Sequence, residues 1–195
     1  MERVVLFDGT STDGWTYPDG SGPIDWIVEG NIMTVGHEDI VSKETFRDAH
    51  VHVEWREPDM PWASGQLKGN SGVYLHGCYE VQILDSYGKP EDKLERNDCG
   101  ALYTICPPLQ NACRPALEWQ TYDIYFRAPR FDEEGNVTEN ARITVLQNDR
   151  LIQNNVELFK TTAGGITREK LKEGPLLLQD HGHPVSFRNV WFERF

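Results

Sequence analysis

Two neighbouring segments, residues 70–76 and 79–88, alternate between apolar and polar side chains with a period of two. This is the period of a β-strand, in which successive side chains point to opposite faces of the sheet. We therefore expect two strands, each with an apolar face against a core and a polar face. The polar faces carry a phenol, an imidazole, a carboxyl and an amide, from Tyr74, His76, Glu80 and Gln82. Such groups can bind the hydroxyl groups of a sugar.

The same kind of alternation recurs along the chain. Residues 50–56 alternate over seven positions, which predicts that Val51, Val53 and Trp55 face the core. Asn148 and Asp149 separate two further apolar runs and are typical of a tight hairpin turn. A tight hairpin is expected from residues 25–28 and 32–35, with its turn at 29–31. Further strands are expected at residues 4–7, 39–42, 99–103, 119–128, 142–146, 151–153, 176–182 and 185–192, with a short helix at 167–172.

About a dozen short, regularly spaced strands with at most one short helix predict an all-β protein, an antiparallel β-sandwich. The 195 residues are enough for one domain, residues 1–195, with a single core. The net charge of −12 argues against a nucleic-acid partner, because phosphate backbones would be repelled. No segment reads as a signal peptide, and no run is apolar enough for a membrane span.

Four cysteines, Cys78, Cys99, Cys106 and Cys113, contain no CxxC pair, so a structural zinc site is not expected. A Cys99–Cys113 disulfide would close a short loop in an oxidising compartment. Buried, reduced thiols are the alternative interpretation.

In such a sandwich, the outer face of a curved sheet can form a trough for an oligosaccharide. Nine polar residues fall on the non-core face by alternation, unless a β-bulge shifts the register. They are Glu54, Arg56, Tyr74, His76, Glu80, Gln82, Gln179, His181 and Arg188. Any one of them could instead be an ordinary exposed side chain of a sheet.

Glu80 is the strongest catalytic candidate, because it lies in the middle of a strand, where a carboxyl can be held rigidly. Glu54 could be a second carboxylate for glycosidic cleavage, or simply an ion-pair partner of Arg56. His181 could act as a base, a metal ligand or a hydrogen-bond partner, and Arg188 could clamp a ligand or neutralise Glu80. Asp180 is expected to bond a loop backbone.

The sequence is similar to the 3-keto-disaccharide hydrolase domain family over nearly its whole length. The motifs that carry this resemblance include LFDGTSTDGW, HVEWR, NSGVYLHG, YEVQILDSYG and LLLQDHGHPVSFRNVWF. The resemblance implies a concanavalin A-like jelly roll and a bacterial enzyme that cleaves a glycoside or oligosaccharide oxidised to a ketone at C3. The ketone acidifies the C2 proton, so a base can start elimination of the C1 leaving group before water is added back.

By the same resemblance, Glu80 or His181 would be the base, and Arg188 or Arg56 would stabilise the enolate. Arg56, Tyr74, His76, Gln82, Gln179 and Arg188 would bind substrate. The resemblance also allows a divalent cation. For calcium, the candidate ligands are Asp85 and Asp180; for a transition metal, they are His76, Glu80 and His181. Secretion or a periplasmic location is also expected from the resemblance alone.

Two other classes of protein fit the same residues. A non-catalytic carbohydrate-binding module would use the trough without turnover. A scaffold protein would have the Glu80 face covered by a partner. Two carboxyls and a histidine favour the enzyme, because catalysis needs titratable groups with shifted pKa values.

Overall fold

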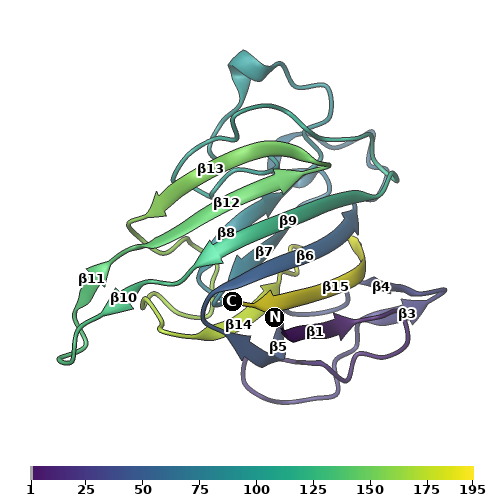
Figure 1. Ribbon diagram of the computed structural model, residues 1–195. Helices are drawn as coiled ribbons and strands as arrows, with labels where there is room; N and C mark the ends of the chain where they lie inside the picture. The colour runs from purple at the N-terminus through teal and green to yellow at the C-terminus, as the bar shows by residue number, and fades with distance from the viewer. Residues whose placement is uncertain (1) are drawn as a thin grey trace.

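The computed structural model describes residues 2–195, which form two antiparallel sheets packed face to face and a small two-stranded ribbon (Figure 1). The eight-stranded sheet runs in the order β13 (Arg150–Leu158), β12 (Ala141–Gln147), β9 (Gln120–Arg127), β6 (Ala49–Arg56), β15 (Ser186–Arg194), β4 (Ile32–Thr34) and β3 (Ile27–Glu29), with β1 (Glu2–Phe7) also paired to β15. The five-stranded sheet runs in the order β2 (Trp15–Thr16), β5 (Ile40–Phe46), β14 (Gly174–Leu178), β7 (Ser71–Leu75) and β8 (Tyr79–Ile83).

The remaining elements are short. β10 (Arg130–Phe131) and β11 (Val137–Glu139) form the ribbon that projects from the sandwich (Figure 1), and two single 3₁₀ turns span Gly65–Leu67 and Glu91–Lys93. The all-β sandwich predicted from the alternating pattern is therefore confirmed, and it is consistent with a jelly roll. No helix in residues 2–195 combines the length and the apolar character that crossing a membrane requires.

The core lies between the two sheets and follows the predicted alternation. Val51, Val53 and Trp55 of β6 are fully buried, and they share one apolar cluster with Val73 and Val81 of the opposite sheet. Burying these side chains removes apolar surface from water, which is the main force that holds the two sheets together. The hairpin turn at 148–149 also matches the prediction, because both residues have positive φ angles, as the tight hairpin turn requires.

β7 and β8 are buried on both faces, although their sequences alternate. The loop at residues 99–106 pairs with the free edge of β8, and the loop at residues 159–172 bonds to Gly77 and Cys78 beside the outer face. The predicted strand at 99–103 is wrong: Leu102 forms only isolated bridges, to Val81 and to Cys106, because Gly100 and Thr104 have positive φ angles that break an extended chain.

The predicted helix at 167–172 is also wrong, since this segment is made of bends and turns. Six residues are too few for a helix to be stable without tertiary support. Side chains hold the loop instead: Arg168 Nη1 donates to Thr162 O at 3.0 Å, and Thr161 Oγ1 donates to Arg168 O at 3.2 Å. The strand expected at 176–182 begins at Gly174 and ends earlier than expected, at Leu178.

A β-bulge interrupts β15 between Arg188 and Trp191, with Asn189 at a φ of 47°. Phe187 and Val190 are both fully buried, so two residues rather than one lie between successive inward side chains. Arg188 and Asn189 therefore both point to the outer face of the eight-stranded sheet.

All four cysteines are free thiols in the structure, which matches the reduced interpretation rather than the disulfide. Cys78 and Cys99 are buried. Gln147 Nε2 lies 3.4 Å from Cys99 Sγ and 3.6 Å from Cys113 Sγ, so the two sulfurs share one polar neighbour.

Candidate active site

A polar pocket of about 160 Å³ opens on the outer face of the five-stranded sheet. Its floor comes from strands β7 and β8, which supply Tyr74, Glu80 and Gln82. The chain just after β14 contributes Gln179 and His181. The walls are loop residues, namely Gln66, Asn70, Tyr103, Ala163 and Gly164. This hollow beside Glu80 argues against the scaffold alternative, which needs that face to be covered.

The backbone N–H and C=O of Glu80 lie at the free edge of β8, and each is bonded to a different loop. Its N–H donates to Thr162 Oγ1 at 3.0 Å, and its carbonyl accepts from the N–H of Tyr103 at 3.3 Å. Thr162 is itself tied to Cys78 O, which accepts from the Thr162 N–H at 2.9 Å. The position of the Glu80 side chain is thus fixed by a strand and by two loops, as a catalytic carboxyl requires.

The Glu80 side chain is nearly inaccessible to water, with an exposed fraction of 3%. Burial raises the pKa of Glu80 from 4.5 to about 8, because the charged form loses its hydration. The adjacent Tyr74 hydroxyl acts in the opposite direction, and the negative charge of Asp39 raises this pKa further. A carboxyl that titrates near neutral pH can both take up and release a proton in a catalytic cycle.

Two buried amide oxygens in the pocket have no donor among the side chains and backbone of residues 2–195. These atoms are Oε1 of Gln82 and Oε1 of Gln179. The Nε2 atoms of the same residues are occupied: Gln82 donates to Asn70 Oδ1 at 3.1 Å, and Gln179 donates to the Tyr74 hydroxyl at 3.0 Å. Buried polar atoms are normally paired, so these two acceptors are available to the hydroxyl groups of a ligand.

Two glycines make room for the pocket residues. A Cβ on Gly72 would lie 2.7 Å from Glu80 Oε1, and a Cβ on Gly164 would lie 2.6 Å from the Tyr74 hydroxyl oxygen. Gly164 also has a positive φ of 82°, which other residues rarely adopt. Any larger side chain at these two positions would displace the carboxyl or the phenol.

His181 lies at the exposed rim of the pocket. The loop that carries it is fixed by Asp180, whose carboxylate accepts from the N–H groups of Glu38 at 3.1 Å and Gly182 at 2.7 Å. This confirms the prediction that Asp180 bonds a loop backbone. His183 has a structural role as well, because its Nδ1 accepts from the Asn70 N–H at 3.0 Å.

The prediction that all nine polar residues share one face is wrong, because Glu54, Arg56 and Arg188 belong to the other sheet. Glu54 lies on β6 and is held by the residues of the β15 bulge: Arg188 Nε donates to Glu54 Oε2 at 2.6 Å, and Asn189 Nδ2 donates to Oε1 at 2.8 Å. Glu54 therefore pairs with Arg188 rather than with Arg56. The Arg188 and Arg56 guanidinium groups pack over the Trp119 ring, with Cζ 4.1 and 4.8 Å from its centre.

His76 also departs from its predicted position beside Tyr74. It occupies the turn after β7 with a φ of 53°, which ends the strand alternation and directs the ring into the protein. The ring packs against Phe46 and Phe126, with ring centres 5.2 and 4.8 Å apart, and Nε2 donates to Arg47 O at 3.1 Å. Burial lowers the pKa of His76, so this imidazole is a neutral core group.

The predicted cation ligands do not come together in the structure. Of the transition-metal set, Glu80 and His181 line the pocket, while His76 is buried away from it. Of the calcium set, Asp85 forms an ion pair with Lys68 at 2.8 Å, and Asp180 accepts from loop N–H groups. Within residues 2–195, no three His, Cys, Asp or Glu side chains are arranged to hold a metal ion.

Sequence reasoning missed the pocket residues that come from loops, namely Gln66, Asn70, Tyr103, Ala163 and Gly164. Asn70 could have been predicted from the sequence, because it immediately precedes β7 in the motif NSGVYLHG. The others lie in segments without periodicity, so no pattern in the sequence relates them to Glu80.

The sandwich and this pocket together define a class of all-β protein that can hold a polar ligand against a buried carboxyl on one sheet. A comparison with protein families places residues 2–193 in the 3-keto-alpha-glucoside-1,2-lyase-like domain. The chain therefore belongs to this family of glycoside-active proteins.

Individual relatives agree with this assignment. A 3-keto-disaccharide hydrolase of Bacteroides thetaiotaomicron is 23% identical over 230 residues, which cover 96% of this chain and 76% of the relative. A crystal structure of a "putative glycosyl hydrolase" from Parabacteroides distasonis is 38% identical and superposes with a TM-score of 0.89, covering 99% of this chain and 84% of the other. A second structure with the same description and organism, at 18% identity and a TM-score of 0.73, covers 97% of this chain and 92% of the other and shares the fold.

Proposed function

We propose that the protein cleaves the glycosidic bond of 3-keto-glucosides, with Glu80 as the base that removes the C2 proton. The observation that carries this proposal is Glu80 itself, a rigidly held carboxyl, almost fully buried, whose pKa is raised to about 8 inside a polar pocket. Membership of the lyase-like family and similarity to a 3-keto-disaccharide hydrolase support the same substrate class.

The chemistry begins with proton transfer from C2 to the Glu80 carboxylate. The electrons of the C2–H bond form the C2=C3 double bond of an enolate, and negative charge develops on the C3 oxygen. Collapse of the enolate forms a C1=C2 double bond and breaks the bond from C1 to the leaving oxygen, which takes a proton from His181 or from water. Addition of water across C1=C2 then gives the 3-keto sugar, and no net oxidation or reduction takes place.

The remaining pocket residues position the sugar. The free oxygens of Gln82 and Gln179 accept from hydroxyl groups of the ring, and the hydroxyl of Tyr74 lies next to Glu80. Glu54 and Arg188 take no part in this scheme, because they pair with each other on the other sheet. A mechanism with Glu80 and Glu54 as a carboxylate pair is therefore not what we propose.

The test is release of p-nitrophenol from p-nitrophenyl 3-keto-α-glucoside and from the unoxidised glucoside. We expect release from the keto substrate alone, and a slower rate when C2 carries deuterium. Glu80→Gln should lower turnover roughly 10²–10⁴-fold, the range for loss of a general base. Glu54→Gln makes the same chemical change on the other sheet and should keep its activity.

Two results would contradict the proposal. Equal release from both substrates would show that cleavage does not need the C3 ketone. No release from either substrate, together with saturable sugar binding that Glu80→Gln weakens, would identify the protein as a carbohydrate-binding module.

A further inference from the structure

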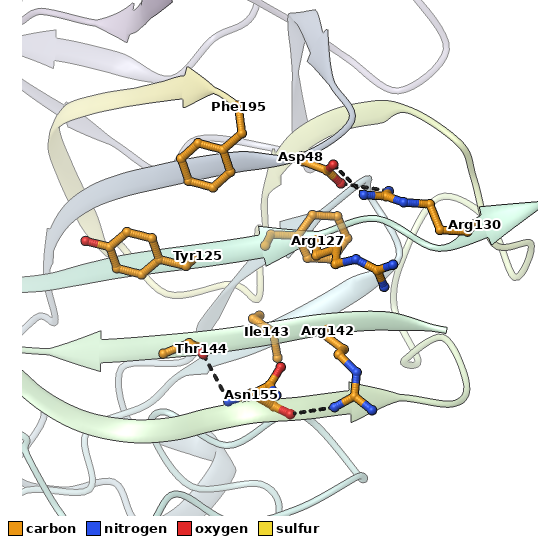
Figure 2. Close-up of a pocket in the computed structure, with 10 residues that line it drawn as sticks. Asp48, Tyr125, Arg127, Arg130, Arg142, Ile143, Thr144, Asn155 and Phe195 are labelled. Atoms are coloured by element: carbon orange, nitrogen blue, oxygen red, sulfur yellow. Dashed lines mark hydrogen bonds and ion pairs between the residues drawn. The ribbon is translucent and has the colours of Figure 1, made fainter. Parts of the chain in front are cut away.

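A second hollow of about 250 Å³ lies on the outer face of the eight-stranded sheet (Figure 2). It shares no lining residue with the Glu80 pocket, which lies on the other sheet. Pockets for drug-sized ligands measure roughly 300–1,000 Å³, so this one suits a single small group such as one sugar residue. Figure 2 shows the ring of Tyr125 toward one end and the guanidinium groups of Arg127, Arg130 and Arg142 toward the other.

Arg127 of β9 and Arg142 of β12 are directly opposite each other in the antiparallel register. Like charges in this position repel each other and destabilise a sheet. Their carboxylate partners are Glu139 and Glu157, whose side chains are 60% and 47% exposed, and exposed ion pairs contribute little. Arg142 Nη1 also donates to Asn155 O at 3.1 Å, which holds this guanidinium group at the hollow. Both guanidinium groups can exchange their carboxylate partners for an anion from solution, which would also relieve their repulsion.

Arg130 closes the same end of the hollow but has a firm partner. Its Nη1 and Nη2 donate to the two carboxylate oxygens of Asp48, at 2.9 and 2.6 Å. This bidentate pair fixes the wall of the hollow and leaves Arg127 and Arg142 as the groups that can take a ligand.

The next two outward-facing residues along β9 and β12 are Tyr125 and Thr144, which lie opposite each other. One face of the Tyr125 ring stacks on His50 of β6, with ring centres 4.4 Å apart and an angle of 11° between the planes. Its register partner on β12 is Thr144, a small residue that also lines the hollow, and Tyr125 remains 43% exposed. An aromatic ring that is held from one side and open on the other can pack against the C–H face of a sugar.

We propose that this hollow binds a hexuronate, a sugar residue with a carboxylate at C6. Successive outward residues of a strand are about 7 Å apart. A pyranose ring stacked on Tyr125 would therefore direct its C6 carboxylate toward Arg127 and Arg142. The site lies on the sheet that does not carry Glu80, so it would anchor an acidic glycan without taking part in bond cleavage.

The test is titration of the whole protein with methyl β-D-glucuronide, methyl β-D-glucoside and acetate, followed by calorimetry and by amide chemical shifts. We expect the glucuronide to bind at least tenfold more tightly than either of the others, with shifts centred on β9 and β12. If the glucoside bound equally tightly, Arg127 and Arg142 would not be recognising a carboxylate, and the proposal would be wrong. Equal binding of acetate would reduce the site to a simple anion site and overturn the proposal.

Variants locate the binding and separate it from the proposed catalytic pocket. Arg142→Gln, Arg127→Gln and Tyr125→Ala should each weaken glucuronide binding at least tenfold while turnover of the 3-keto substrate persists. Arg3→Gln removes the same charge from β1 of the same sheet, outside the hollow, and should bind normally. If Glu80→Gln abolishes glucuronide binding and Arg142→Gln does not, the ligand occupies the Glu80 pocket and the proposal is wrong.

Discussion

Replacement of Glu80 by glutamine should stabilise the protein, and by an amount that depends on pH. Burial raises the pKa of Glu80 from 4.5 to about 8 in the folded protein. Between these two values the folded state binds more protons than the unfolded state, so stability falls as pH rises. A tenfold change in proton affinity corresponds to about 1.4 kcal/mol, so ionised Glu80 costs the folded protein up to about 5 kcal/mol above pH 8.

The glutamine variant has the same shape and no charge, so it should not suffer this loss. The free energy of unfolding, measured by urea titration from pH 5 to pH 9, should favour Glu80→Gln increasingly, by roughly 1 kcal/mol for each pH unit up to about pH 8. Comparison with the wild type at each pH cancels the contributions of carboxyls that do not interact with Glu80, such as the buried Glu57. Glu134→Gln, in an exposed turn, is the matched control and should show no such trend.

A difference between wild type and Glu80→Gln that stays constant from pH 5 to pH 9 would refute this reasoning. It would mean that the carboxyl ionises equally easily in the folded and unfolded states. The pocket would then be wet enough to hydrate the charge, and Glu80 would lose the property that makes it the proposed base.

Three other predictions concern the same residues. Turnover of the 3-keto substrate should rise with pH and level off above about pH 8, because the base must be ionised; a pH–rate profile that falls from pH 6 to pH 8 would contradict this. Gly72→Ala should reduce turnover more than thermal stability, because its Cβ would lie 2.7 Å from Glu80 Oε1; unchanged kinetics would show that the carboxyl can move away freely. Glu54→Gln should lower the free energy of unfolding by about 1–3 kcal/mol, because the donors on Arg188 and Asn189 lose a charged acceptor. A urea titration that matches the wild type would show that these hydrogen bonds do not contribute to stability.

Much of the strand pattern could be predicted because it is a local property. An alternating sequence can bury one face only as a strand, so β6, β7, β8, β9 and the hairpin of β12 and β13 follow from spacing alone. The errors fall where periodicity is absent or short. Residues 99–103 and 167–172 have too little pattern to define an element. The first segment is shaped by its pairing with β8, and the second by hydrogen bonds to Thr161 and Thr162.

The sequence by itself determined that Glu80 points away from the core and that Tyr74 and Gln82 do the same, because alternation fixes the two faces within a strand. Only the tertiary structure decided which polar residues meet. Alternation does not say which sheet a strand joins, so Glu54 and Arg188 could not be separated from Glu80 without the strand order. The turn at His76 and the bulge at Asn189 are single-residue changes of φ that redirect side chains, and the loops around Thr162 and Tyr103 reach Glu80 only through long-range packing.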